Sequence, residues 1–403
     1  MAKTVLIIST MDTKGDETQY VKKKMESLGL KSLLMDISMR GHEGYIADIT
    51  PHDVASSGGS SFQEIHDSRD RSRITNITIT GASSIAKELF AESKIDGVIG
   101  IGGSTGSLMA TEVMRTLPFG IPKLMISSTA ALPGLSTRYI GTSDIVLFHS
   151  VIEISGISDL LKNIMDRAAH AIAGMLQGDV TSPQADKVKA IAMTMLGPCE
   201  KCASSVRTSL EKEGNQVIGF SAAGIGDKAM EEMISQGLFH GIIDLAPGGV
   251  GEHLFGFMRD AGPHRLESAG KAGIPQIISM CSVNHITPAK SRYKPEYHQR
   301  RKYDLDKYRT WLRISPDELK QVAVAFAEKL NRSQGTVKIV IPLKGWSSVD
   351  IPGNPTYDPD EDQIFTENLR ENLKPEIEIL KVDANMEDQE FAEAVTKAAL
   401  DIL

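Results

Sequence analysis

Short apolar runs alternate with stretches of helical periodicity along the whole chain. This alternation is typical of parallel α/β proteins, in which each buried strand is followed by a helix that covers the sheet. In the first half, the apolar runs predict strands at residues 4–9, 32–37, 97–101, 123–127 and 145–148. A long helix is predicted over residues 158–177, where the apolar residues fall on one face.

The same pattern restarts after residues 178–183, a stretch with Gly and Pro that interrupts the long helix. The second half predicts helices at 361–373 and 387–403, and strands at 188–196, 216–220, 241–245, 276–280, 337–341 and 377–382. We therefore expect an α/β protein of two Rossmann-like domains, residues 1–180 and 187–403, with mainly parallel sheets facing an interdomain cleft. Ligands of such sheets bind beyond the carboxyl ends of the strands.

Composition narrows the class of protein. A chain of 403 residues is longer than one hydrophobic core usually supports, which agrees with two domains. The net charge of −8 argues against a general nucleic-acid or membrane partner. It leaves open the possibility of a local basic patch that binds such a partner. The N-terminal run turns polar too soon for a signal peptide, and three cysteines cannot build a disulfide framework. We expect a cytoplasmic protein.

A glycine-rich loop, residues 102–107, follows the predicted strand at 97–101 and precedes a helical pattern. A strand, a glycine-rich turn and a helix N-terminus together present backbone N–H groups to an anion. The loop matches neither the dinucleotide fingerprint nor the Walker motif. The alternative is a tight turn without a ligand, a common use of glycine. The candidate phosphate-binding residues are Gly102, Gly103, Ser104, Thr105 and Gly106.

The first predicted β–α turn brings together Asp12, Thr13 and Lys14. Lys14 could neutralise a phosphate, while Asp12 could hold a metal ion or a ribose hydroxyl. The alternative is helix capping, which suits the acidic residues that follow but does not explain Lys14.

Two further loops of small residues are expected at the same edge of the first sheet. One contains Ser128 and Thr129, and the other contains Gly141, Thr142 and Ser143. Small hydroxyl residues are also the ordinary material of turns, so each loop alone has a structural alternative.

In the second half, Glu252 lies beside His253 after a predicted strand. Glu252 is a candidate general base or metal ligand, and the alternative is an incidental pair. No second histidine stands at zinc spacing, so we expect no metal held by the protein alone. Asp350 is a further candidate, because it lies outside the helix start that Asp358 and Pro359 predict.

Two other features have competing explanations. Cys199 and Cys202 form a C-x-x-C pair, but nothing else supports redox chemistry, so we interpret the spacing as incidental. Residues 290–313 hold nine Lys or Arg against three Asp or Glu, with four tyrosines and a tryptophan interleaved. Such a segment could stack on nucleic-acid bases, pack across a dimer partner or cover an anionic ligand. The acidic chain around it favours an interface or a lid.

Taken together, these segments resemble the ATP-binding domain family of the tomato mosaic virus resistance protein, from one end of the chain to the other. The resemblance rests on an ordered set of motifs: Thr10-x-Asp12-Thr13-Lys14, residues 97–104, residues 139–144, Gly224-x-Gly226 with residues 229–231, residues 342–345 and residues 350–359. It implies a two-domain Rossmann-like fold, dimer formation and ATP binding, with residues 12–14 and 102–107 as nucleotide contacts. One glycine of the plant loop is replaced here by Thr105, and a typical His-Asn pair is replaced by Asp304 and Leu305.

The resulting expectation is a cytoplasmic, homodimeric ATP-binding protein of unassigned activity, with or without Mg²⁺. ATP binding does not establish hydrolysis, since no Walker lysine is present. The alternative is an enzyme of carbohydrate or acid-sugar metabolism that acts on a small phosphorylated or carboxylated substrate, with Lys14, Glu252 and Asp350 as acid–base candidates. A third possibility is a regulatory scaffold whose residues 290–313 bind a protein or RNA.

Overall fold

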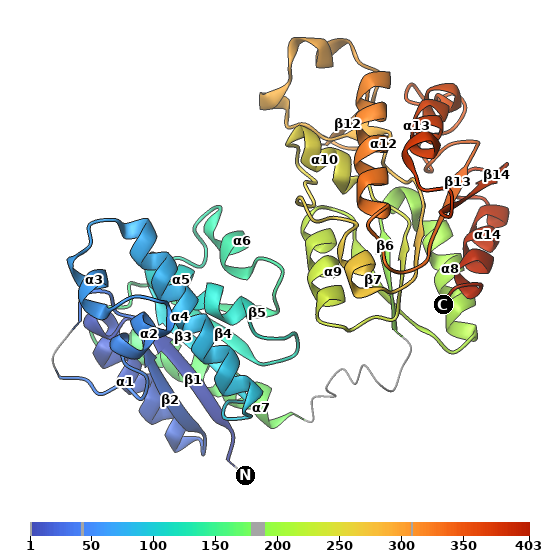
Figure 1. The fold of residues 1–403 in the computed structure, drawn as a ribbon. Helices are drawn as coiled ribbons and strands as arrows, with labels where there is room; N and C mark the ends of the chain where they lie inside the picture. Colours follow the sequence, from blue (N-terminus) through green and yellow to red (C-terminus); the bar gives the residue numbers. More distant parts are fainter. Residues whose placement is uncertain (1, 42–43, 179–189, 308) are drawn as a thin grey trace. The chain divides into compact units, whose positions relative to one another are not determined.

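The computed structural model describes residues 2–41, 44–178, 190–307 and 309–403. The chain divides into two compact units, residues 1–182 and residues 183–403 (Figure 1). Each unit is an α/β structure built on a parallel sheet, as the sequence predicts.

The first unit contains a five-stranded sheet in the order β2-β1-β3-β4-β5. Every neighbouring pair of these strands is parallel. The five predicted strands are confirmed to within one residue, at β1 (Thr4–Ser9), β2 (Lys31–Asp36), β3 (Gly97–Gly102), β4 (Lys123–Ser127) and β5 (Ile145–His149). Their apolar runs are almost continuous because both faces of the sheet are covered by helices.

Helices cover the two faces of this sheet in separate sets. Val5 and Ile7 of β1 pack under α1 and α7, whereas Leu6 and Ile8 pack under α4 and α5. The sheet therefore has a switch point between β1 and β3, where the following helices leave to opposite faces. The helices are α1 (Met11–Ser27), α2 (Pro51–Ser57), α3 (Phe62–Asp67), α4 (Arg71–Ala91), α5 (Ser104–Arg115), α6 (Leu135–Ile140) and α7 (Asp159–Gln177).

The second unit contains a six-stranded parallel sheet in the order β14-β13-β9-β8-β6-β7. Its strands are β6 (Ala190–Met195), β7 (Gln216–Ser221), β8 (Gly241–Asp244), β9 (Gln276–Ile278), β13 (Val337–Pro342) and β14 (Glu378–Val382). Each lies within a predicted run or within one residue of it. The first two residues of the run predicted at 188–196 fall outside the described residues.

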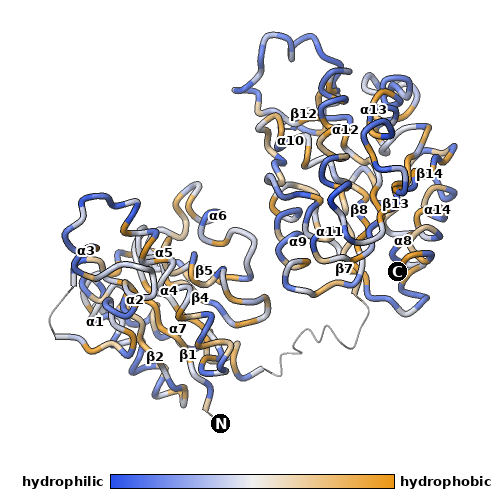
Figure 2. Tube along the Cα trace, viewed as in Figure 1, coloured by the Kyte–Doolittle hydropathy of each residue, from blue (hydrophilic) through white to orange (hydrophobic). Residues whose placement is uncertain are grey.

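Two sets of helices also enclose the second sheet. Ile191 and Met193 of β6 pack under α8 and α14, whereas Ala192 packs on the opposite face with α9. The switch point of this sheet lies between β6 and β8. The helical elements are η1 (Gly197–Cys199), α8 (Glu200–Lys212), α9 (Ile225–Ser235), α10 (Gly249–Phe255), α11 (Ser268–Ala272), α12 (Pro316–Leu330), α13 (Pro359–Asn372) and α14 (Gln389–Leu400). Apolar segments in Figure 2 follow the strands and the inner faces of these helices.

The basic, aromatic segment 290–313 is part of the second unit. It contains the short turns η2 (Lys290–Arg292) and η3 (Pro295–Gln299) and the strands β11 (Lys302–Asp304) and β12 (Thr310–Arg313). With β10 (His285–Ile286), these strands form a three-stranded antiparallel sheet that the sequence analysis did not predict. Tyr297 and Trp311 are buried within the unit, so neither of these aromatic side chains belongs to a free arm.

Candidate functional site

The loops after β1 and β3 meet at the switch point of the first sheet. Thr10 forms a hydroxyl–hydroxyl hydrogen bond with Thr13 (3.0 Å), and a Cβ placed on Gly106 would lie 3.7 Å from Thr10 Oγ1. The hydroxyl of Ser107 donates to Ser127 Oγ at 2.6 Å, which ties the glycine-rich loop to the end of β4. The structure thus brings together the turn after β1, which contains Thr13, the glycine-rich loop after β3 and the end of β4.

The two helices that begin at this edge differ in what their N-termini contact. The first N–H groups of α1 are used internally, because Met11 donates to Asp36 and Asp12 donates to the hydroxyl of Ser38. No side chain caps α5, whose N-cap residue is Gly103. The N–H groups at a helix start attract an anion. The glycine-rich loop therefore offers the better anion site of the two.

A groove of about 480 Å³ opens beside the first turn of α5. Arg71 and Arg138 contribute cationic side chains to it, and neither forms an ion pair within the part of the unit that the structure describes. The sequence analysis missed both, because a single exposed arginine at a helix end carries no local signal. The groove is lined by Met39, Arg71, Ser72, Thr75, Asn76, Ile79, Thr105, Leu108, Glu112 and Arg138.

Lys14 lies near this edge but is engaged by the fold. Its ammonium donates to the carbonyl of Ile154 and lies 3.8 Å from the Glu153 carboxylate. Ser128 donates to the same carboxylate at 3.3 Å, and the hydroxyls of Thr129 and Tyr139 are 2.8 Å apart. Lys14 and Ser128 therefore share one acidic neighbour close to the glycine-rich loop.

The expectation that Gly141, Thr142 and Ser143 join this edge is wrong. These residues immediately precede β5, whose first residue pairs with Lys123 at the start of β4. They therefore lie at the amino end of the strands, opposite the glycine-rich loop. A Cβ on Gly141 would lie 2.9 Å from the side chain of Arg115, the last residue of α5.

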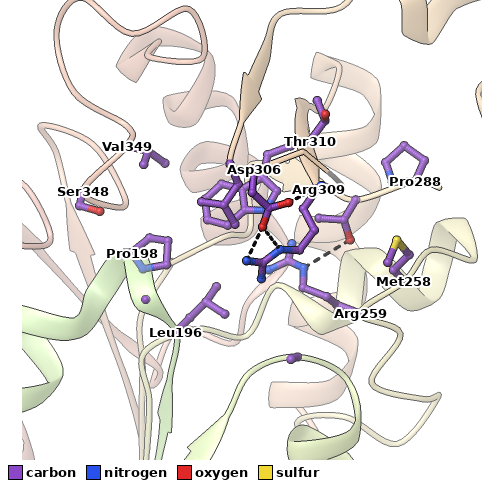
Figure 3. A pocket seen from close by; sticks show the side chains of 15 residues that line it. Leu196, Pro198, Met258, Arg259, Pro288, Asp306, Arg309, Thr310, Ser348 and Val349 are labelled. Carbon is purple, nitrogen blue, oxygen red and sulfur yellow. Dashed lines mark hydrogen bonds and ion pairs between the residues drawn. The ribbon is translucent and has the colours of Figure 1, made fainter. Parts of the chain in front are cut away.

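The second unit contains a pocket of about 750 Å³ at the carboxyl edge of its sheet (Figure 3). Loops that follow β6, β7, β10 and β13 contribute to it, together with the hairpin between β11 and β12. Its lining residues are Leu196, Gly197, Pro198, Ala223, Met258, Arg259, Thr287, Pro288, Leu305, Asp306, Arg309, Thr310, Trp311, Ser348 and Val349.

Glu252 lies beneath this pocket and is fully buried. Its carboxylate accepts hydrogen bonds from Thr287 Oγ1 (2.8 Å) and from Arg259 Nη2 (2.8 Å). The arrangement fixes the guanidinium of Arg259, and it leaves Glu252 no contact with solvent. His253 instead pairs with Asp260 at 2.8 Å.

Asp350 is also fully buried, in a polar cluster behind the small sheet. It accepts from the backbone N–H of Trp346 (2.8 Å) and from Asn284 Nδ2 (2.9 Å). Asn284 donates equally to Asp362, which forms an ion pair with Arg313 at 2.6 Å. Burial raises the pKa of Asp362 to about 8, although the Arg313 guanidinium opposes this shift. The cluster has the character of a structural network.

The described residues hold no group of three His, Cys, Asp or Glu side chains that could bind a metal ion. Cys199 and Cys202 are buried free thiols, and burial raises the pKa of Cys202. A raised thiol pKa disfavours the reactive thiolate, which agrees with an incidental C-x-x-C spacing. None of the described helices has the length and apolar character needed to cross a membrane.

Comparison with known proteins matches both units to one family. Residues 3–181 match the N-terminal domain, and residues 188–403 the C-terminal domain, of the uncharacterised protein family UPF0261. The chain belongs to the UPF0261 family. A UPF0261 protein of Clostridium tetani is 33% identical over 405 residues, which covers all of both chains. A UPF0261 protein of Brucella suis is 30% identical over 96% of this chain and 93% of its own.

The tomato ToMV resistance protein Tm-1(GCR237) is 31% identical to this UPF0261 chain over 99% of the chain. This chain spans 55% of the length of that plant protein. The resemblance seen in the motifs is thus confirmed as membership of UPF0261, whose description names no activity. ATP binding, dimer formation and a cytoplasmic location stay predictions.

Solved structures resemble this UPF0261 chain only distantly. A putative UDP-N-acetylglucosamine 2-epimerase from Listeria monocytogenes is 13% identical over 69% of this chain and 78% of its own, with a TM-score of 0.23. The MurG structure from Acinetobacter baumannii is 12% identical over 99% of each chain, also with a TM-score of 0.23.

Proposed function

We propose that this protein binds a small phosphorylated ligand at the switch point of its first unit. The observation that supports this proposal is the N-terminus of α5, which no side chain caps and which lies beside a groove lined by Arg71 and Arg138. A phosphate on these N–H groups would be stabilised by the helix dipole. The two guanidiniums would neutralise further negative charge on the ligand.

The glycine-rich loop has the room that such a ligand requires. A Cβ on Gly103 would meet nothing closer than Ser128 Oγ at 3.8 Å, so packing does not explain why this residue is glycine. An open backbone at the start of a helix allows close approach by a phosphate. The groove volume of about 480 Å³ falls within the range of small-molecule sites, about 300–1,000 Å³.

ATP is the first ligand we propose for this site. Mg²⁺ would enter with the nucleotide, because Mg²⁺ commonly binds through substrate phosphates with one or two carboxylates. Asp12 is the carboxylate of the nearby turn that could take part. The metal would neutralise phosphate charge, while Arg71, Arg138 and the α5 N-terminus would orient the phosphates.

The alternative ligand at the same site is a phosphorylated sugar, which would indicate an enzyme of carbohydrate or acid-sugar metabolism. Glu252 and Asp350 are buried in ion pairs and hydrogen bonds, so we do not propose them as the groups that exchange protons with substrate. Lys14, at the edge of the first site, is the acid–base candidate that this alternative retains.

Calorimetric titration with ATP and with glucose 6-phosphate, each with and without Mg²⁺, tests both ligands. We expect saturable binding that Gly103→Val and Arg138→Gln each weaken at least about tenfold. Gly174→Ala and Lys87→Gln are matched controls, since both residues are exposed on helices of the same unit. Selective binding of ATP supports the nucleotide, and selective binding of the sugar phosphate supports the alternative. No binding of either, or binding unchanged in both site variants, would overturn the proposal.

A further inference from the structure

The pocket of the second unit is lined by Arg259, whose guanidinium is held in place by buried side chains. Arg259 donates from Nε (3.2 Å) and Nη2 (2.8 Å) to the buried Glu252 carboxylate, and from Nη1 to the hydroxyl of Ser282. Thr287 steadies the same carboxylate. The side chain of Arg259 is 11% exposed. An arginine mounted in this way loses little conformational freedom when it binds a ligand.

Two N–H donors of Arg259 remain available. A guanidinium has five N–H groups, and the three donor nitrogens each use one of them on Glu252 or Ser282. Among the described residues, the remaining two, on Nη1 and Nη2, have no acceptor and can donate to a ligand carboxylate. Ser282 adopts a left-handed backbone conformation, with φ of 63°, which a non-glycine residue rarely adopts. Such strain often accompanies a functional site.

A second guanidinium, that of Arg309, lines the same pocket (Figure 3). It comes from the hairpin between β11 and β12 and pairs with Asp306 at 2.6 Å, while its side chain is 60% exposed. Each arginine is therefore already paired with a carboxylate, Arg259 with Glu252 and Arg309 with Asp306. Because these charges balance, the pocket suits a ligand with a single negative charge better than a dianion.

The rest of the pocket is apolar. Trp311 forms part of the wall, with its ring centroid 5.8 Å from the guanidinium carbon of Arg259. The hydroxyls of Thr287 and Thr310 are committed to Glu252 and Asp304. Among the described lining residues, Ser348 alone keeps a hydroxyl without a hydrogen bond. The apolar lining residues are Leu196, Pro198, Ala223, Met258, Pro288, Leu305, Trp311 and Val349.

We infer that this pocket binds a carboxylic acid with an apolar body about the size of a ring, its carboxylate on Arg259 and Arg309 and its body against Trp311. A sugar acid fits less well, because each ligand hydroxyl that loses water needs a polar partner that the side chains here do not supply. The inference does not depend on the phosphorylated ligand, since every lining residue belongs to the second unit.

Four probes test the inference on the full-length protein: benzoate, the neutral analogue benzamide, the hydroxylated carboxylate gluconate and the dianion phenyl phosphate. Calorimetry reports binding, as does the intrinsic tryptophan fluorescence, to which Trp311 and Trp346 contribute. We expect benzoate to bind at least about tenfold more tightly than each of the other three.

The choice of variants follows from the burial of Glu252. Arg259→Gln would leave that carboxylate buried without its cation, so a loss of binding there could reflect misfolding. Arg309→Gln changes an exposed side chain, and Ser348→Trp fills the pocket from an exposed position. Each substitution should weaken the binding of benzoate at least about tenfold without changing the melting temperature of the protein. Arg332→Gln, exposed on the same unit, is the control.

Three results would overturn the inference. The first is binding of gluconate, benzamide or phenyl phosphate as tight as that of benzoate. The second is benzoate binding that survives unchanged in both Arg309→Gln and Ser348→Trp. The third is the absence of saturable binding of benzoate below about 10 mM, a concentration at which even weak ligands occupy their sites.

Discussion

The glycines of the glycine-rich loop in the first unit differ in whether the surrounding structure leaves room for a Cβ. A Cβ on Gly102 would lie 2.9 Å from the backbone of Gly106, a distance that real Cβ atoms do not tolerate. On Gly103 and Gly106 the nearest atoms are hydroxyl oxygens 3.8 Å and 3.7 Å away. The fold therefore requires glycine at 102, whereas a Cβ would fit at 103 and 106 in ordinary van der Waals contact.

The first prediction separates these two requirements. Gly102→Ala should lower the free energy of unfolding by about 1–3 kcal/mol, because the added methyl group overpacks the turn. Gly103→Ala should change it by less than about 1 kcal/mol yet weaken binding of a phosphorylated ligand. Urea unfolding and calorimetry measure the two effects. Equal destabilisation by both substitutions would contradict this assignment.

The buried carboxyl of Asp362 predicts a pH dependence of stability. Its folded pKa of about 8 lies above the unfolded value, so the folded state binds the proton more tightly. Stability from this group is present below about pH 4 and is lost as the pH rises toward about 8. A rise of about four pKa units corresponds to several kcal/mol, and we expect Asp362→Asn to abolish this pH-dependent loss.

Urea unfolding of the wild type and of Asp362→Asn at pH values across this window measures the difference. Asp360→Asn is the control, because Asp360 is exposed in the same first turn of α13. Parallel stability curves for the wild type and Asp362→Asn would contradict the prediction.

At the scale of elements, the small antiparallel sheet is joined directly to the main fold of the second unit. Strand β12 ends at Arg313, and Ser315, the N-cap that precedes α12, follows two residues later. Ser315 and Glu318 form a capping box, and Glu318 also accepts two hydrogen bonds from Arg300 (2.7 Å and 3.1 Å). The start of α12 thus anchors the segment that carries part of the pocket.

Removal of this cap should destabilise the second unit. Ser315→Ala removes the hydroxyl oxygen that accepts a hydrogen bond from the Glu318 N–H, and we expect a loss of about 1 kcal/mol in the free energy of unfolding. Ser204→Ala, at an exposed position within α8, should change the same quantity by less than about 0.5 kcal/mol. Thermal unfolding of the two variants compares them directly. A smaller loss for Ser315→Ala than for Ser204→Ala would show that the cap does not stabilise α12.

At the scale of the whole molecule, each unit has its own hydrophobic cores. The clusters of the first unit are built on β1, β3 and β4, and those of the second on β6, β8, β9 and β13. Each cluster draws its residues from one unit alone. Separate cores are the physical basis of separate folding domains.

We therefore expect two transitions in scanning calorimetry rather than one. A ligand that binds the folded state raises the melting temperature of the unit to which it binds. The phosphorylated ligand should raise the melting temperature of the transition whose melting temperature Gly102→Ala lowers. Benzoate should raise the melting temperature of the transition whose melting temperature Ser315→Ala lowers. A single two-state transition, or a shift of the same transition by both ligands, would contradict the independence of the two sites.

The sequence by itself determined the strands, the long helices and the parallel α/β class, because these depend on local periodicity and on glycines at strand ends. It also located the loops after β1 and β3, since the carboxyl ends of parallel strands share one edge. The sequence analysis did not predict the strands β11 and β12, because strands of three and four residues are too short to show a clear apolar pattern.

Tertiary structure alone decided which residues line the candidate sites. It placed Gly141 at the far edge of its sheet and buried Glu252 and Asp350 in internal networks. It also brought Arg71 and Arg138 to one groove, and Arg259 and Arg309 to one pocket. Strand order, burial and the pairing of charges depend on contacts between residues far apart in the chain, and local sequence patterns do not encode those contacts.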